Sequence, residues 1–391
     1  MKTAIVTWIS YNNYGTLLQA YALQQQLNRI GIKSTILCDR MILDEHKAKN
    51  PLHVKDSQFV CNDKEKKLAR LCALIHNPKR LGKILEARVN RTKYERPYTE
   101  SQDLCNLFKE RDLSIYYDVF GDNLTALNNC FDAFIAGSDQ VWSVFENAFN
   151  PYYFLDFVTR KKISYAPSLG TSVISQNISE QLKKLLDDYD NISVREKTTA
   201  EQLSGMLRRK VDWVVDPTLL HDREFWEQFT SKIPRRKKRY LLCYFLENRK
   251  WYFSYAKKLA KELHLELLLL PNRWDYISSE YVVETGVGPK EFVSLIRHSD
   301  YVLTDSYHGS IFSLIFQRDF QYLLRFNNDD QFSQNIRIQS LFDSLDLKDR
   351  IVCAGMEKLP TQRIENYKMV TSKIEEMRCS SQQYLQNCFA K

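Results

Sequence analysis

The residues best suited to chemistry lie between positions 301 and 313. An apolar run, Tyr301–Leu303, leads into small polar residues and then into His308 and Gly309. This order predicts a strand, a tight loop and the first turn of a helix. His308 is the one side chain of the loop that titrates near neutral pH, and helix N-termini attract anions through their free N–H groups. The loop can therefore support proton transfer beside a bound phosphate or carboxylate.

A second set of candidates consists of arginines that can hold such an anion. Arg195 directly follows an apolar, β-prone run, and Arg325 and Arg337 follow the His308 loop. A guanidinium makes bidentate hydrogen bonds to carboxylate or phosphate. We expect a small anionic donor to be bound by Arg195, Ser306, Gly309, Ser310, Arg325 and Arg337, with His308 and Asp305 as the catalytic candidates. A single arginine is more often a surface charge, and an isolated histidine is more often a helix cap or a satisfied core residue.

A third set of polar residues follows strand candidates in the N-terminal half. Residues 12–15 come after Thr3–Trp8, and residues 139–142 come after Phe131–Ala136. Because the carboxyl ends of parallel strands meet at one edge of a sheet, these side chains should lie together. We expect a hydroxyl-rich acceptor to be bound by Asn12, Asn13, Tyr14, Gly15, Asp139, Gln140 and Trp142. Asp139 is also typical of a turn residue that bonds to its own backbone.

The elements that must position these residues alternate between strands and helices. Thr3–Trp8, a helical pattern that ends at Gly31, and Ser34–Cys38 form a βαβ opening. Further strands end in polar residues, which predicts an α/β fold with its loops gathered on one edge. The first loop lacks the glycines of a dinucleotide fingerprint, so no nicotinamide cofactor is expected.

The basic run Pro234–Arg239 marks the clearest boundary, because five cations after a proline suit an exposed linker. A nuclear-localisation signal is the alternative interpretation. The α/β pattern then restarts, which predicts two Rossmann-like domains facing each other across a cleft. The expected division is an N-terminal acceptor-side domain over 1–234 with a basic helical insertion at 64–110, a C-terminal donor-side domain over 235–358, and a helix in 359–391 that crosses back.

The net charge of +8 is concentrated in one segment, since Lys64–Arg96 holds 11 Lys and Arg against 3 Glu. Its leucines and isoleucines predict basic amphipathic helices, which either rest on an anionic membrane surface or form a solvated face. The N-terminus lacks a signal-peptide core, and nine cysteines show no metal-ligand spacing. We therefore expect a cytoplasmic protein, peripheral at most to the inner membrane face, with no metal and no nucleic-acid partner.

Five motifs in order resemble the polysaccharide pyruvyl transferase family. They are residues 13–24 (NYGTLLQAYALQ), 135–142 (IAGSDQVW), 193–196 (SVRE), 216–220 (DPTLL) and 304–309 (TDSYHG). The resemblance implies a fold similar to two-domain GT-B glycosyltransferases. It also implies transfer of the enolpyruvyl unit of phosphoenolpyruvate, a co-substrate, onto a sugar to form a pyruvate ketal. The expected acceptor is a lipid-linked oligosaccharide or polysaccharide in capsule or exopolysaccharide assembly, and no cofactor is implied.

One position departs from the family. In characterised members the residue two positions before the histidine is an arginine that helps to bind phosphoenolpyruvate, and here it is Ser306. Arg195 matches the family arginine of the first domain. The second cation would come from Arg325 or Arg337, or the donor differs. The alternatives are a GT-B glycosyltransferase that uses a nucleotide sugar, and a non-enzymatic binder of membrane or nucleic acid.

Overall fold

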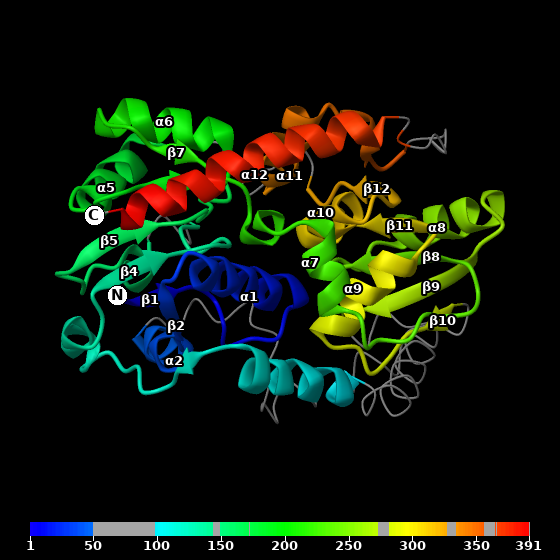
Figure 1. Cartoon of the computed structure of the whole chain (residues 1–391). Coiled ribbons are helices and arrows are strands. Elements are labelled where there is room, and N and C mark those ends of the chain that lie inside the picture. The colour runs from blue at the N-terminus through cyan, green and yellow to red at the C-terminus, as the bar shows by residue number, and fades with distance from the viewer. Residues whose placement is uncertain are drawn as a thin grey trace, which may run out of the picture.

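The structure is a computed structural model that describes residues 1–49, 98–143, 149–171, 173–272, 281–326, 334–355, 364 and 366–390. Two parallel β-sheets lie side by side with helices packed around them, and one long helix, α12 (Tyr367–Phe389), runs along both (Figure 1). The basic segment Lys64–Arg96 lies outside the described residues, so its expected membrane contact stays a prediction.

The first sheet holds five parallel strands in the order β3-β2-β1-β4-β5. These are β1 (Lys2–Val6), β2 (Lys33–Leu37), β3 (Ile115–Tyr116), β4 (Ala133–Ala136) and β5 (Lys161–Ser164). A bridge between Ile163 and Asn191 continues it to the parallel pair β6 (Ser193–Val194) and β7 (Asp212–Trp213). The strand order reverses beside β1, so the loops after β1 and β4 form the crevice where ligands bind in such sheets.

The second sheet holds six parallel strands in the order β10-β9-β8-β11-β12-β13. These are β8 (Tyr240–Phe245), β9 (Glu266–Pro271), β10 (Val282–Val283), β11 (Tyr301–Thr304), β12 (Asp319–Leu323) and β13 (Ile351–Val352). This is the strand order 3-2-1-4-5-6 of a Rossmann domain, with its switch point between β8 and β11. The predicted α/β class with two Rossmann-like domains is confirmed.

Helices connect the strands and cover the sheets. In the first domain these are α1 (Tyr14–Arg29), α2 (Arg40–Lys49), a helix at 98–112, α5 (Gln176–Leu186), α6 (Lys197–Leu207) and α7 (Arg223–Phe229). In the second they are α8 (Lys250–Glu262), α9 (Pro289–His298), α10 (Tyr307–Ile315) and α11 (Ile336–Leu345). Short 3-10 turns lie at Leu124–Asn129, Pro151–Phe154, Pro217–Leu220 and Lys348–Arg350. None of the helices in this described part of the chain combines the length and apolar character needed to cross a membrane.

Two strand predictions were displaced along the chain. The apolar run Ile163–Ala166 predicts a strand, which lies at Lys161–Ser164 in the structure. The run Trp213–Val215 predicts another, which lies at Asp212–Trp213. Ala166 has a left-handed φ of 55°, so the backbone has already left the sheet there. The apolar residues at the ends of both predictions are buried without being paired in a strand.

Two helices tie the domains together from different sides (Figure 1). On one side, α12 reaches the first domain, where Arg378 Nε donates to the Leu219 carbonyl at 2.7 Å and Tyr384 donates to the Ser164 carbonyl at 2.8 Å. On the other side, the helix at 98–112 contacts the second domain, because Ser101 Oγ accepts from the Val287 N–H at 2.9 Å. These contacts hold the two sheets at one relative orientation.

The domain interface itself is apolar. A single hydrophobic cluster includes Leu17 and Leu18 of α1 together with residues of α9 and α10. Trp226 of α7 meets Phe312 of α10 edge to face at 4.9 Å between ring centroids. Domains joined through large apolar surfaces move less freely than those joined through polar ones. We therefore treat the residues at this interface as one fixed site.

Candidate active site

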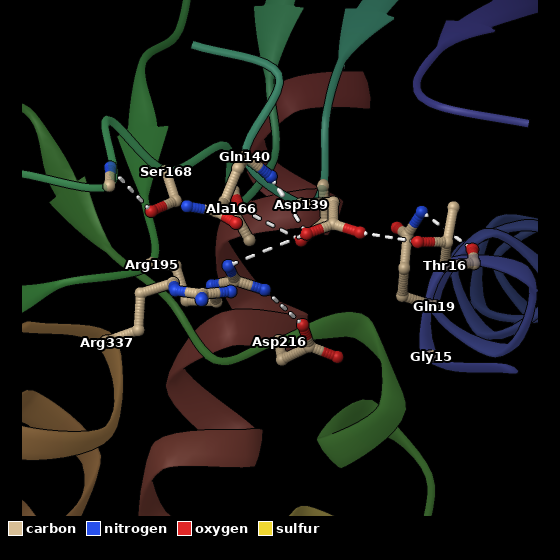
Figure 2. Close-up of polar contacts among 12 residues, drawn as sticks. Gly15, Thr16, Gln19, Asp139, Gln140, Ala166, Ser168, Arg195, Asp216 and Arg337 are labelled. Atoms are coloured by element: carbon tan, nitrogen blue, oxygen red, sulfur yellow. Dashed lines mark hydrogen bonds and ion pairs between the residues drawn. The ribbon is translucent and has the colours of Figure 1, made fainter. Parts of the chain in front are cut away.

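The start of α1 and the loop after β4 are joined by short polar contacts. Asn13 caps α1, since its side-chain oxygen accepts from the N–H groups of Gly15 and Thr16 at 3.0 and 3.3 Å. Thr16 Oγ1 in turn donates to Asp139 Oδ2 at 2.9 Å, and Asp139 Oδ1 accepts from the Gln140 N–H at 2.9 Å. Figure 2 shows the Asp139 carboxylate lying between Thr16 and Arg195. Both switch-point loops of the first sheet thus converge on Asp139.

Arg195 stands at the centre of the site and is only 4% exposed. Its Nη1 donates to Asp216 Oδ2 at 2.8 Å, whereas Nη2 lies 3.9 Å from Asp139 and Nε lies 3.6 Å from Glu196. The guanidinium carbon sits 4.6 Å from the centre of the Tyr307 ring. Only the Asp216 contact is of hydrogen-bond length, and neither Nε nor Nη2 has a hydrogen-bond partner among the described residues. Arg195 is therefore a buried cation with unused donors.

Arg337 brings a second cation to the same ring from α11 of the second domain. Its guanidinium carbon lies 6.0 Å from the centre of the Tyr307 ring, and Figure 2 shows it beside Arg195. Burial, followed by the charges of Arg195 and Arg325, lowers the pKa of Arg337 to about 10. Its Nε is shielded from solvent and has no partner in the described part of the chain. Two like charges so placed favour the binding of an anion between them.

Arg325 lies near the same group of charges but is directed toward Asp305 and Glu247. Its Nη2 lies 3.4 Å from Glu247 Oε1, and its Nε lies 4.0 Å from Asp305 Oδ2. Desolvation opposes the charge of Arg325, yet Asp305 raises its pKa. Of the two arginines expected after the histidine loop, Arg337 is the one aimed at Arg195.

His308 lies directly on the start of α1. A methyl group added to Gly15 would come within 2.1 Å of His308 Nδ1, so the ring occupies the space that only glycine leaves open. On its other edge, Nε2 is 3.4 Å from Asp216 Oδ2, within ion-pair range but outside normal hydrogen-bond geometry. Burial alone would raise the pKa of Asp216, but the charges of His308 and Arg195 hold it well below its usual range. Asp216 thus contacts both His308, the candidate general acid, and Arg195, the candidate anion-binding residue.

Asp305 stabilises the loop after β8 through hydrogen bonds to its backbone. Its two oxygens accept from the N–H groups of Leu246 and Glu247 at 2.6 and 3.0 Å, and the residue is completely buried. Desolvation raises the pKa of Asp305 to about 6, against the charge of Arg325 and the two N–H groups. The geometry assigns this carboxylate a part in holding two loops together.

Ser306, Gly309 and Ser310 form the first turn of α10. Ser306 is its N-cap and accepts from the Gly309 N–H at 3.3 Å, while Ser310 Oγ donates back to the Ser306 carbonyl at 3.3 Å. A side chain on Gly309 would come within 2.7 Å of Thr304 Oγ1. These small residues allow the helix start to pack tightly against β11.

Two of the residues expected to bind the acceptor pack and form hydrogen bonds within the protein. Trp142 is completely buried, stacks on Phe154 at 5.0 Å and donates its indole N–H to the Tyr153 carbonyl at 3.0 Å. Tyr14 stacks on Phe292 at 4.8 Å and donates to the Val287 carbonyl at 3.1 Å. Trp142 belongs to the core of the first domain and Tyr14 to the domain interface, where it also lines a pocket with Asn12 and Asn13, so their part in acceptor binding stays a prediction.

The remaining acceptor candidates differ in whether their side-chain donors have hydrogen-bond partners. Asn12 Nδ2 donates to the Gln102 carbonyl at 3.3 Å and to Asn106 Oδ1 at 3.2 Å, so this amide faces the helix at 98–112. Gln140 is 8% exposed, and its Nε2 has no partner among the described residues. A side chain on Gly170 would come within 2.8 Å of that nitrogen. Asp139 and Gln140 lie at the site beside Arg195, and Asn13 and Gly15 form the start of α1 against His308.

Two carboxylates were missed as site residues, although both lie in segments that carry the family resemblance. Asp216 is the residue shared by Arg195 and His308. Glu196 is 1% exposed, and neither of its oxygens makes a hydrogen bond of normal geometry within the described ranges. Burial raises the pKa of Glu196, while Arg195 lowers it. The sequence signal that could have identified them was their position shortly after a strand, with Glu196 two residues after β6 and Asp216 three residues after β7.

A small pocket lies beside these groups, between the domains and α12. Arg195 and Asp216 line it from the first domain, Tyr307 from the second, and Met377 from α12. No group of three His, Cys, Asp or Glu side chains suited to a metal ion is found in the described ranges. The arrangement is a buried, charged site of two arginines, three carboxylates and one histidine at the junction of two Rossmann-like domains.

Two Rossmann-like domains around a buried group of charged residues agree with a transferase. The family model of polysaccharide pyruvyl transferases matches residues 13–320, which is most of the chain. The protein belongs to the polysaccharide pyruvyl transferase family. The comparison with curated proteins gives no match.

Solved structures with the same general architecture are distant in sequence. UDP-GlcNAc 2-epimerase from Neisseria meningitidis bound to UDP-GlcNAc has a TM-score of 0.45 at 10% identity, with 100% of this chain and 95% of that chain covered. MurG from Acinetobacter baumannii has a TM-score of 0.42 at 10% identity, with 99% and 98% covered. The heptosyltransferase WaaC from E. coli with ADP-2-deoxy-2-fluoro heptose has a TM-score of 0.40 at 12% identity, with 96% and 99% covered. At this low similarity the ligands of those proteins say nothing about the ligand of this one.

Proposed function

We propose that this protein transfers the enolpyruvyl unit of phosphoenolpyruvate to two hydroxyls of a sugar, forming a cyclic pyruvate ketal and releasing phosphate. The observation that carries this proposal is the pair of arginines from opposite domains, Arg195 and Arg337, which meet at Tyr307. Arg195 Nη1 donates to Asp216 and Arg337 Nη2 donates to Gln334, but Nε and Nη2 of Arg195 and Nε of Arg337 are shielded donors without hydrogen-bond partners among the described residues. Membership of the family supports the reaction class.

The donor would recover the hydrogen bonds that these arginines lack. A buried donor without a partner costs about 1–3 kcal/mol, and more when it is charged. Phosphoenolpyruvate carries a carboxylate and a phosphate, which together match two guanidinium groups. Arg337 would thereby supply the cation that characterised family members place two residues before the histidine, where this chain has the helix cap Ser306.

The chemistry then divides between His308 and its neighbours. His308 protonates the methylene carbon of the donor, and the neighbouring carbon becomes oxocarbenium-like. A first sugar hydroxyl adds to that carbon and returns its proton to His308. A second hydroxyl adds and the C–O bond to phosphate breaks, so its proton leaves with the phosphate. Asp216 is a positioning residue, since it contacts both His308 and Arg195. A positioned histidine contributes about 10²–10⁴-fold to such proton transfers.

The acceptor we propose is a sugar of a lipid-linked oligosaccharide or polysaccharide, used on the cytoplasmic side in capsule or exopolysaccharide assembly. The family description supports a glycan acceptor. Asp139 and Gln140 would hold its hydroxyls; their position at the switch point of the first sheet, next to Arg195, supports this part of the proposal.

The experiment measures phosphate release from phosphoenolpyruvate with a panel of lipid-linked and aryl galactosides, mannosaminides and glucosides. Donor binding is measured separately by calorimetry. Removing one charged contact in Arg337→Ala should weaken donor binding about 10–100-fold. His308→Ala should lower turnover about 10²–10⁴-fold with donor affinity little changed. Arg223→Ala, which removes an arginine paired with Glu227 on α7, is the matched control and should behave like the wild type.

The outcomes separate the alternatives. Equal donor affinity in Arg337→Ala and the wild type would refute the assigned anion site. Binding of a uridine nucleotide with no binding of phosphoenolpyruvate would replace the proposed donor by a nucleotide sugar. If phosphoenolpyruvate binds but no acceptor in the panel supports phosphate release, the proposed acceptors are wrong.

A further inference from the structure

Tyr11 is the aromatic residue that the structure leaves uncovered at the site. It lies in the loop after β1, between Ile9, which is 1% exposed, and Tyr14, which is 9% exposed, yet Tyr11 itself is 43% exposed. An exposed aromatic ring beside a ligand crevice is uncommon unless it contacts something there. Tyr11 was absent from the residues expected to bind the acceptor.

The hydroxyl end of Tyr11 points inward although its ring is exposed. It lies beside Thr16 and in the electrostatic field of Asp139 and Arg337. Thr16 Oγ1 donates to Asp139 Oδ2 at 2.9 Å, and Asp139 lies 3.9 Å from Arg195. The ring thus stands between solvent and the candidate active site, with its polar tip at the residues that would orient a hydroxyl.

The loop that carries Tyr11 is rigidly supported. The completely buried Asp39 accepts from the N–H groups of Ile9 and Ser10 at 3.4 and 3.0 Å, and from the Tyr153 hydroxyl at 2.7 Å. Trp8 packs between the two tyrosine rings, 5.8 Å from Tyr11 and 6.5 Å from Tyr153. The Tyr11 ring is therefore held in place, which lowers the entropy cost of binding a ligand against it.

We propose that the exposed face of Tyr11, backed by Trp8, is the surface on which the pyranose ring of the acceptor stacks. The apolar C–H face of a sugar packs on an aromatic face, while the sugar hydroxyls extend toward polar groups at the ring edge. Here those groups are Thr16 and Asp139, next to Arg195. This assignment rests on the proposed function, because it names the subsite that would hold the second substrate.

The first experiment compares Tyr11→Ala and Tyr11→Phe with the wild type in the phosphate-release assay. Tyr11→Ala removes the stacking surface and should raise the acceptor KM about tenfold while donor affinity stays unchanged. Tyr11→Phe keeps the ring, so its acceptor KM should stay within about threefold of the wild type. Tyr117→Ala is the matched control, since Tyr117 is 57% exposed and follows β3 at the far end of the same sheet. An acceptor KM in Tyr11→Ala equal to that of Tyr117→Ala would overturn the assignment.

A second measurement separates this inference from the proposed reaction. Saturation-transfer NMR with the aryl galactosides, mannosaminides and glucosides of the panel detects sugar binding without turnover. We expect signals from the sugar ring protons with the wild type, Tyr11→Phe and Tyr117→Ala, and their loss with Tyr11→Ala. Equal signals from all four proteins would refute stacking on Tyr11. Absence of phosphoenolpyruvate binding with the sugar signals intact would instead refute the donor and leave the sugar subsite standing.

Discussion

Replacing Gly15 by alanine is the sharpest test of how the two domains meet. In a helix this exchange normally stabilises a protein by about 0.5–1 kcal/mol, because glycine loses more backbone entropy on folding. At Gly15 the new Cβ would lie 2.1, 2.5 and 2.8 Å from Nδ1, Cγ and Cε1 of His308. Carbon contacts are comfortable at about 3.5–4.0 Å, so the ring must move by about 1.4 Å or more.

Because the His308 ring must move, Gly15→Ala should destabilise the protein instead of stabilising it. Forcing an extra methyl into a packed site costs about 1–3 kcal/mol, and the displaced ring would lose its 3.4 Å contact with Asp216. The control is Gly205→Ala on α6, where nothing lies within 4 Å of an added Cβ and the normal gain should appear. The two variants should therefore differ by about 2–4 kcal/mol.

Thermal unfolding measures this difference. Because one hydrophobic cluster runs through both domains, we expect a single transition. With an unfolding entropy of about 2.1 cal/mol/K per residue over 391 residues, 1 kcal/mol corresponds to a Tm shift of about 1 °C. Gly15→Ala should therefore melt about 2–4 °C below Gly205→Ala, with phosphate release strongly reduced.

A double-mutant cycle tests whether the clash with His308 causes the loss of stability in Gly15→Ala. In a His308→Ala background the clash is gone, so Gly15→Ala should become neutral or stabilising, and the coupling between the two positions should reach about 1–3 kcal/mol. The reasoning would be refuted if Gly15→Ala lowered stability equally with and without His308, or if Gly15→Ala were as stable as Gly205→Ala.

Two further predictions concern Asp305 and Trp142. Burial raises the pKa of Asp305 to about 6, so the stability that this group contributes is fully present below about pH 4 and is lost as the pH rises to about 6, by about 3 kcal/mol. The difference in unfolding free energy between Asp305→Asn and the wild type should therefore change over that pH window in denaturant titrations; a constant difference would show that Asp305 titrates normally. Trp142→Phe removes the hydrogen bond to the Tyr153 carbonyl and should cost about 1–3 kcal/mol of stability with the acceptor KM unchanged. A raised acceptor KM at full stability would return Trp142 to the acceptor site.

Several features of this protein follow from local sequence alone. Apolar periodicity and terminal residues act over a few positions, so the pattern of Tyr301–Thr304 predicts a strand and that of Pro289–His298 predicts a helix. The structure has both elements at these bounds. The placement of polar residues after strands also indicated which loops carry the site, since parallel strands bring those ends together. His308, Arg195 and Asp139 were found in this way, and all three lie within one group of contacts.

The tertiary structure decided what the side chains in those loops contact. Trp142 and Tyr14 follow strands just as Tyr11 does, yet Trp142 fills the core, Tyr14 fills the domain interface and only Tyr11 stays exposed. Residue type and spacing do not reveal which face of a loop is covered, because the covering groups come from distant segments such as Phe292. For the same reason the role of Asp216 appeared only when the chain brought Arg195, 21 positions away, and His308 of the other domain to its two sides. Local pattern determined the elements and their loops, while burial and charge pairing, which depend on contacts between segments far apart in the chain, determined the site.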